Sequence, residues 1–172
     1  MALVLKNRYK YDLIFRNKLI LSGTEKEPIF IKPNSSDSIW GTIALQGIKT
    51  KGSRIENVVI SGGSGYESAN NKYSGMLSIH DTKDILLENI TLKDNHIFDD
   101  IVHFVYSYNI NLNNCDIQNA FSDAIDIDIS TNVTITNSKF INSTNDAIDF
   151  MESEALVDSS FIAGSNDKGI SV

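Results

Sequence analysis

The chain has 172 residues, 41% of them hydrophobic, which suits one domain with its own core. It has no apolar run as long as a membrane span and a single cysteine, so neither a transmembrane helix nor an intrachain disulfide framework is expected. The net charge is −7, and residues 94–172 alone hold 13 acidic against 2 basic side chains, so nucleic acid is not an expected partner.

Residues 1–40 predict strands that lead into the fold. Short apolar stretches are separated by Gly23 and Pro28, as expected for brief strands; they are Leu13–Phe15, Leu19–Leu21 and Ile29–Ile31. The N-terminus shows no charged-then-apolar leader with a cleavage site. We therefore expect either an intracellular chain or one whose leader has been removed.

Residues 41–172 predict a series of coils. Thr42–Leu45 with Arg54–Ile60 fits one coil, and Gly75–His80 with Asp84–Asn89 fits the next. Between them, residues 61–74 form an insertion rich in Gly, Asn and Ser. Such an insertion either shapes a binding site beside a solenoid or is a loop without a role.

The second half of the chain repeats itself. An aspartate recurs at Asp100, Asp123, Asp146 and Asp167, at spacings of 23, 23 and 21 residues. An Asn or Asp also precedes an apolar residue by three positions; these pairs are Asn89 and Leu92, Asn114 and Ile117, Asn137 and Phe140, and Asp158 and Phe161. A period in this range is typical of stacked repeats.

The repeats are built from strands. Ile125, Ile127 and Ile129 are expected on one face and Asp126 and Asp128 on the other, which is the period-2 pattern of a half-buried strand. We therefore predict an all-β fold, a parallel β-helix of about 22–23 residues per coil, with strands stacked about 4.8 Å apart. The repeated asparagines are expected at corners, hydrogen-bonded to one another as a ladder.

The end of the sequence predicts an incomplete solenoid. Gly169–Val172 stops in the middle of an expected strand, and the last coil of a solenoid needs a cap. We expect a fragment of a longer helix, the remainder lying in a longer chain, or else end-to-end self-association.

These features resemble the right-handed parallel β-helix proteins of the pectate-lyase-like superfamily. The resemblance is carried by the Asp-x-Ile-x-Ile phrase, the Asn-x-x-Ile/Phe phrase, the asparagine ladder and Gly23-Thr24 with Pro28–Ile31, and covers about residues 18–172. It implies a right-handed helix and a carbohydrate-related role, because members include polysaccharide lyases, glycoside hydrolases, uronate epimerases and non-catalytic surface modules. Their catalytic signatures do not transfer: the repeats lack arginine, Asn-Thr-Asp and Gly-His-Gly, and Asp100-Ile101-Val102-His103 has one residue more than the Asp-Pro-His of epimerases.

Counting back from the corner asparagines places polar residues in outward columns. One column holds Ser78, His103, Asp126 and Asp149; the next holds His80, Val105, Asp128 and Met151. We predict Asp126, Asp128, Asp149 and His103 as catalytic residues, with one carboxyl group as acid and one as base; the alternative for the three aspartates is a solvated face without a role. Neighbours in a column lie near the roughly 5 Å of retaining glycosidases, and residues two apart lie roughly 6.7 Å apart, within the inverting range.

A third column lies at the preceding corner and contains Asp100, Asp123 and Asp146. Two roles are open for it. Aspartates at turns accept backbone N–H groups. Alternatively, these three residues and Asp99 bind Ca²⁺, which prefers oxygen ligands.

Two functions remain open at this point. The first is a polysaccharide-binding or polysaccharide-degrading β-helix acting as a hydrolase, lyase or epimerase, with a polysaccharide as partner and Ca²⁺ as the expected cofactor. The alternative is a non-catalytic structural or adhesive module of a larger bacterial surface protein. Both favour an extracellular or cell-surface location.

Overall fold

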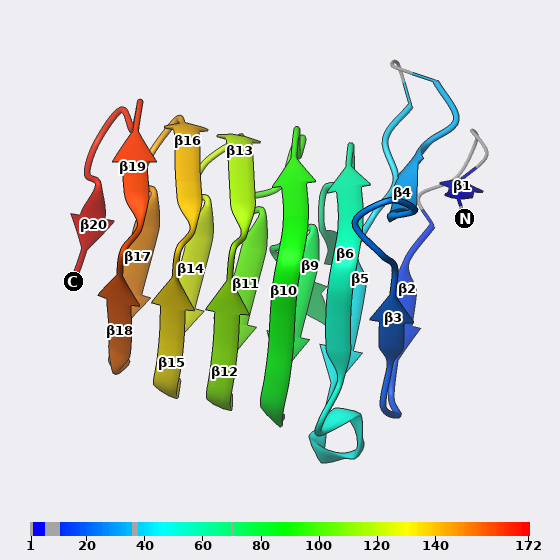
Figure 1. Ribbon diagram of the computed structural model, residues 1–172, viewed down its shortest axis with the longest axis horizontal. Coiled ribbons are helices and arrows are strands. Elements are labelled where there is room, and N and C mark those ends of the chain that lie inside the picture. The colour runs from blue at the N-terminus through cyan, green and yellow to red at the C-terminus, as the bar shows by residue number, and fades with distance from the viewer. Residues whose placement is uncertain (1, 6–10, 36–37, 70) are drawn as a thin grey trace.

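The computed structural model describes residues 2–5, 11–35, 38–69 and 71–172. Parts of the predicted N-terminal segment (residues 1, 6–10, 36 and 37) and residue 70 of the predicted insertion lie outside the described residues. The described chain is a right-handed parallel β-helix, as predicted (Figure 1). Its one short 3-10 helix, η1, spans Ile48–Thr50, and the described residues include no helix long and apolar enough to cross a membrane.

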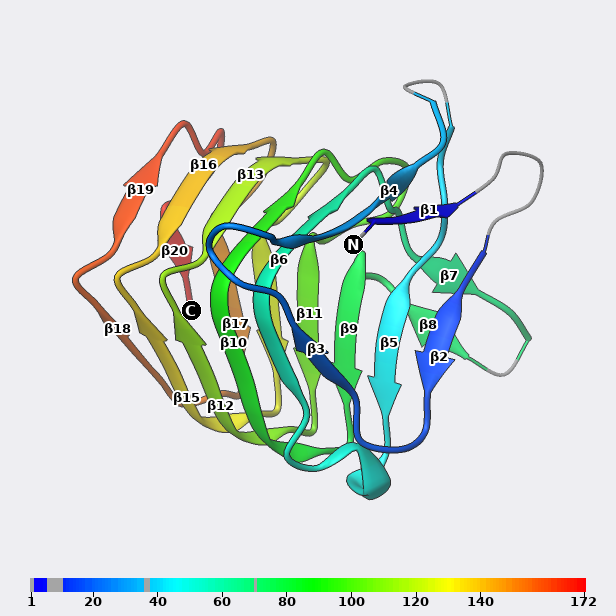
Figure 2. The same ribbon diagram turned by 45° about the vertical axis from the view of Figure 1, so that its right-hand side comes forward.

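The strands form two long sheets that face each other (Figure 2). The seven-stranded sheet runs in the order β2 (Leu13–Phe15), β5 (Ile43–Gln46), β9 (Leu77–His80), β11 (Val102–Val105), β14 (Ile125–Asp128), β17 (Ile148–Met151) and β20 (Ile170–Ser171). The eleven-stranded sheet contains β1 (Ala2–Leu5), β3 (Ile20–Ser22), β4 (Ile29–Pro33), β6 (Arg54–Ser61), β10 (Lys83–Lys93), β12 (Tyr108–Asn113), β13 (Asp116–Ala120), β15 (Thr131–Thr136), β16 (Lys139–Ser143), β18 (Ala155–Asp158) and β19 (Phe161–Ala163).

The core consists of apolar columns between the sheets. In the seven-stranded sheet one inward column is buried through five coils, at Ile43, Leu77, Val102, Ile125 and Ile148. The eleven-stranded sheet supplies matching columns, such as Ile55, Leu87, Leu112 and Ile135. Because the same residue type recurs at the same height in each coil, the alternation seen in one repeat is sufficient to build a continuous core.

The corners are held by ladders of Asn side chains, as predicted, but the described residues form three ladders rather than one, two of which begin at an aspartate. Their residues have positive φ, which Asn tolerates better than most residues. The hydrogen bonds run from Asn114 to Asn89 (2.7 Å), from Asn109 to Asp84 (2.7 Å) and Asn132 to Asn109 (3.0 Å), and from Asn119 to Asp94 (2.7 Å) and Asn142 to Asn119 (3.2 Å). The predicted ladder ends early, because Asn137 donates to Asn113 instead of Asn114.

The predicted register of the fourth repeat is wrong by one residue. Phe140 pairs with Ile162, not with Phe161, and Phe161 is 56% exposed. The left-handed corner residue there is Ser159, not Asp158. The inward residue still follows the corner by three positions, but the coil is one residue longer than counting to Asp158 suggested.

Ile129 was also misplaced by the alternation rule. Its φ is +45° and its side chain is 37% exposed, because β14 ends at Asp128 and the chain turns there. The alternation therefore holds only within the strand.

The first coil and the insertion are more ordered than the sequence suggested. β2 pairs with β5, and β3 and β4 pair with β6, so the predicted N-terminal strands already lie in the parallel register of the coils. The predicted insertion contains an antiparallel hairpin of β7 (Tyr66–Glu67) and β8 (Lys72–Tyr73). This hairpin projects beside β5 and β9 (Figure 2).

Candidate functional site

The outward columns of the seven-stranded sheet have the predicted register. His103 pairs with Ser78 on one side and Asp126 on the other, and Asp126 pairs with Asp149. Val105 lies between His80 and Asp128 in the neighbouring column. Because strands β11, β14 and β17 are short and parallel, they present His103 and three carboxyl groups on one face.

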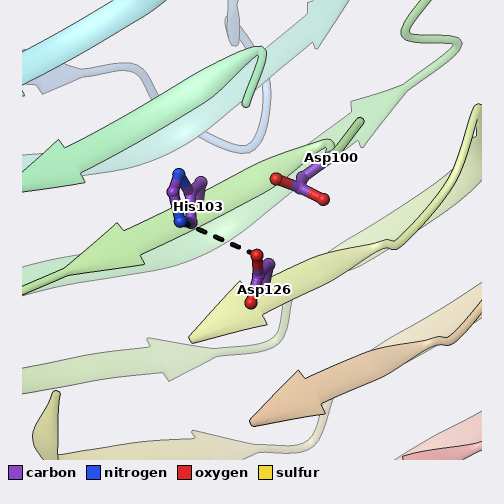
Figure 3. A group of neighbouring side chains, drawn as sticks. All are labelled: Asp100, His103 and Asp126. Atoms are coloured by element: carbon purple, nitrogen blue, oxygen red, sulfur yellow. Dashed lines mark ion pairs between the residues drawn. The ribbon is translucent and has the colours of Figure 1, made fainter. Parts of the chain in front are cut away.

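His103 faces Asp126 of the neighbouring strand (Figure 3). Its Nε2 lies 3.3 Å from Asp128 Oδ2 and 3.7 Å from Asp126 Oδ2. Its Nδ1 lies 2.7 Å from Ser74 Oγ, and that hydroxyl donates to Asp100 Oδ2 at 2.7 Å. A continuous polar chain therefore runs from buried Asp100 through Ser74 and His103 to the two carboxyl groups on β14.

Asp100 is fully buried in the turn before β11. Burial raises its pKa well above the ordinary value, and the nearby charge of Asp126 raises it further, whereas the Ser74 hydrogen bond opposes both. Its Oδ1 has no hydrogen-bond partner among the described residues. The site thus contains a carboxyl group whose protonated form is strongly favoured.

The Asp126 carboxyl group is perturbed in the same direction. Burial raises the pKa of Asp126 to about 7, and the neighbouring carboxyl groups of Asp128 and Asp149 add to the effect. The carboxyl groups of Asp126 and Asp128 both lie beside one atom, His103 Nε2. A carboxyl group that favours its protonated form, beside further carboxyl groups, can act as the acid of a site.

The imidazole completes this arrangement. Burial lowers the pKa of His103, although its hydrogen bond to Asp128 acts in the opposite sense. If Ser74 donates to Asp100, the neutral ring carries its proton on Nδ1, and Nε2 is an acceptor that faces Asp126 and Asp128. An acceptor nitrogen beside two carboxyl groups is satisfied only when one of them is protonated. His103 and the Asp126–Asp128 pair therefore favour the same single-proton state.

The predicted calcium residues are only partly brought together. Donor atoms of Asp99, Asp100 and Asp123 lie within 4.8 Å of one another, as do donor atoms of Asp100, His103 and Asp126. Asp146 is not in either group, because its carboxyl group accepts the Lys168 backbone N–H at 2.7 Å and lies 3.9 Å from the Lys168 ammonium.

Two corner aspartates accept backbone N–H groups, which was the alternative to calcium binding. Asp123 Oδ1 accepts the backbone N–H of Asp146 at 2.7 Å, and Asp146 repeats the same bond to Lys168. Asp100 differs, since it accepts the Ser74 hydroxyl instead. The orphaned oxygen of Asp100 fits a hard cation, but calcium at this corner stays a prediction.

Sequence reasoning missed the contribution of the hairpin. Ser74 directly follows β8, and its only signal was its place in an insertion rich in polar residues. Tyr73 is buried against His80, with ring centroids 5.2 Å apart, and His80 meets His103 edge-on at 5.1 Å. The outward surface that carries Asp126, Asp128 and Asp149 is called the aspartate face below. The insertion therefore supplies one member of the polar chain and lies at one end of the aspartate face.

Comparisons with known proteins show the architecture. No protein-family model and no curated protein sequence matches the chain. The fold is similar to that of a "putative glycosyl hydrolase" from Parabacteroides merdae ATCC 43184, with a TM-score of 0.51 and 13% identity over 85% of this chain and 78% of that one. An alginate lyase from Paenibacillus sp. str. FPU-7 aligns with a TM-score of 0.49 and 18% identity over 98% of this chain and 61% of that one. At these identities the likeness concerns the β-helix fold alone.

Proposed function

We propose that this chain is a carbohydrate-active β-helix that binds a polysaccharide along the outward face of β11, β14 and β17 and cleaves a glycosidic bond there. The observation that carries the proposal is the convergence of three carboxyl groups from two adjacent coils, with Asp126 and Asp128 both beside His103 Nε2. Glycoside cleavage needs such a pair, one group protonated and one ionised.

The neighbours of each carboxyl group suggest how the roles divide. Asp126 supplies the proton to the departing glycosidic oxygen, because its environment favours the acid form. Asp149 pairs with Asp126 in the next coil, where neighbouring strands lie about 4.8 Å apart, close to the separation used by retaining glycosidases. Its carboxylate attacks the anomeric carbon as the glycosidic bond breaks, and water then hydrolyses the glycosyl ester with Asp126 as the base. Asp128 and His103 hold the proton of Asp126 in place.

The solved structures are consistent with this proposal at the level of architecture. The Parabacteroides protein, described as a hydrolase of glycosidic bonds, shares the β-helix. A shared fold does not select a reaction, so the proposal rests on the aspartate face itself.

The test is an activity screen followed by three matched variants. The purified chain is incubated with neutral and acidic polysaccharides, and reducing ends and unsaturated products are measured separately, because only elimination creates the latter. Asp126→Asn and Asp149→Asn are expected to reduce turnover by at least 10²-fold, the scale of general acid–base catalysis. Asp158→Asn, an exposed carboxyl group on the other sheet, serves as the control and should leave turnover unchanged.

The outcomes separate the two functions. Turnover that survives in both Asp126→Asn and Asp149→Asn would exclude this face as the catalytic centre. Glycan binding without any turnover by the native chain would instead identify the chain as a non-catalytic module, the alternative that its sequence left open.

A further inference from the structure

A polar hollow of about 300 Å³ lies beside the aspartate face, at the end of the sheet nearer the N-terminus. It is lined by Arg16, Gln46, Asn71, Lys72, Tyr73 and His80. Three adjacent strands end at it: β5 with Gln46, β9 with His80, and β2 just before Arg16. Strand β8 of the hairpin closes one side. The hollow thus combines parts of the first coils with the insertion.

The charge of this hollow is opposite to that of the aspartate face. Arg16 and Lys72 are exposed, and neither forms an ion pair within the described part of the chain. Two acids lie beside it: Glu67, which pairs with Lys72 in the hairpin, and Asp81, whose carboxylate accepts a 2.6 Å hydrogen bond from Gln46 Nε2. Gln46 in turn accepts the Tyr73 hydroxyl at 3.2 Å, so the polar wall is held in one orientation.

His80 gives a second and independent sign of a ligand. Its side chain is only 9% exposed, it lines the hollow, and its Nε2 has no hydrogen-bond partner among the described residues. Buried polar atoms in folded proteins are rarely left unpaired, and such an atom needs an explanation. A ligand atom in the hollow would supply the missing partner.

One outward column of side chains connects the hollow with the aspartate face. Gln46 pairs with His80, His80 with Val105 and Val105 with Asp128, and Arg16 follows the last residue of β2 beside β5. Three inter-strand steps of about 4.8 Å place Gln46 roughly 14 Å from Asp128. One extended oligosaccharide lying across the coils can therefore reach both places at once.

We propose that this hollow binds an anionic group of the polysaccharide, a carboxylate or a sulfate ester, and thereby makes the site selective for an acidic glycan. Arg16 and Lys72 provide charged donors, and the uncharged His80 imidazole can provide a buried N–H through Nε2. The inference rests on the proposed function and names its substrate class. It also explains how an acidic protein accepts an acidic glycan, since the anionic group binds away from the carboxyl groups that act on the glycosidic bond.

The test measures binding at equilibrium and does not require turnover. Two matched pairs of probes distinguish the anion: an oligogalacturonate against its methyl ester, and a sulfated galactan oligosaccharide against its desulfated form. In calorimetric titrations the acidic member of one pair is expected to bind at least tenfold more tightly than its neutral partner. The Arg16→Gln/Lys72→Gln double variant should lose at least tenfold in affinity for that acidic probe, with little change for the neutral one.

Controls make the result specific to the hollow. Lys139→Gln removes an exposed charge on β16, in the other sheet, and should retain the preference. Thermal melting verifies that the double variant is folded, which is expected because both side chains are exposed. Equal binding within both probe pairs, or a preference that persists in the double variant, would overturn the proposal.

The failure of this inference can be told from failure of the proposed function. Asp126→Asn leaves the hollow intact and should keep the preference while losing turnover. A preference for the acidic probe in a native chain without turnover would overturn the catalytic role and support the hollow. If the native chain cleaves the probes but binds the neutral and acidic members with equal affinity, the catalytic role is supported and the hollow is overturned.

Discussion

Single side chains at this site were predictable where they lie on a strand and unpredictable where they lie on a corner or in the insertion. Asp126, Asp149 and His103 share a column because the strand register follows from the repeat. Ser74 comes from the insertion, where no periodicity fixes its position. The approach of Asp126 and Asp128 to the same nitrogen of His103 depends on how both side chains lean, and a strand pattern specifies direction only to one face or the other.

His80 should make the protein sensitive to acid. Burial, with a smaller effect of His103, lowers the pKa of His80 to about 3, whereas the unfolded chain binds a proton near the ordinary value of about 6.5. Stability that is present above pH 6.5 is therefore lost as the pH falls toward 3. Between pH 7 and pH 4 this residue should cost on the order of 3 kcal/mol in the free energy of unfolding.

Urea denaturation at several pH values checks this expectation. His80→Gln should unfold with a weaker dependence on pH than the native chain, while His96→Gln, at an exposed position, should keep the native dependence. Identical pH profiles for His80→Gln and the native protein would show that His80 is not the acid-sensitive group.

At the corners between strands, asparagine has two roles, one for its backbone and one for its side chain. The ladder asparagines occupy left-handed backbone positions and also hydrogen-bond along the stack. The sequence predicted one such ladder from the Asn-x-x-apolar phrase. The other two were missed because aspartates begin them, at Asp84 and Asp94, and their positions lie outside that phrase. The wrong register after Asn137 arose for a related reason, since Ser159 holds the left-handed corner without being an Asn or Asp.

Asn114 allows these two contributions to be separated. Asn114→Ala loses the 2.7 Å bond to Asn89 and places a Cβ-bearing residue without a polar group at φ +52°, so it should lower the free energy of unfolding by about 2 kcal/mol. Asn114→Gly loses only the bond and should cost about half as much. Asn111→Ala, at an exposed strand position, is the control and should change stability by less than about 0.5 kcal/mol. Equal losses in the Ala and Gly variants would show that backbone strain is unimportant there.

The whole molecule is a stack in which each coil contacts only its neighbours. Core residues of the middle coils, such as Phe104 and Ile127, are completely buried, whereas the inward residues Val157 and Ile162 of the last full coil are only partly buried. Such stacks can open from an end without disturbing the centre.

Hydrogen exchange measures this gradient directly. Backbone amides of β9, β11 and β14 should exchange most slowly, and those of β18, β19 and β20 should exchange fastest among the strands of the last coils. Mass spectrometry of peptic fragments resolves these segments. Uniform protection along the stack would contradict the expected gradient and indicate a single cooperative unit.

The fold was the most predictable level, because a repeat of 23 residues with strict alternation is compatible with few architectures. The hollow was the least predictable. Its residues come from three coils and a hairpin, and Arg16 and Lys72 are far apart in the sequence and follow no shared motif.

The distribution of charge along the chain has a consequence for encounters in solution. Because the coils are stacked in sequence order, the acidic residues 94–172 occupy one end of the solenoid, and β2 and β5 lie toward the other (Figure 1). Arg16 directly follows β2, and Lys72 lines the same hollow. The molecule therefore carries an electric dipole along its long axis. A polyanion that approaches within a Debye length, about 8 Å at physiological ionic strength, is turned by this field so that its charged groups meet the N-terminal coils first. The orientation of the glycan is set before contact, and added salt should slow its association more than it speeds its release.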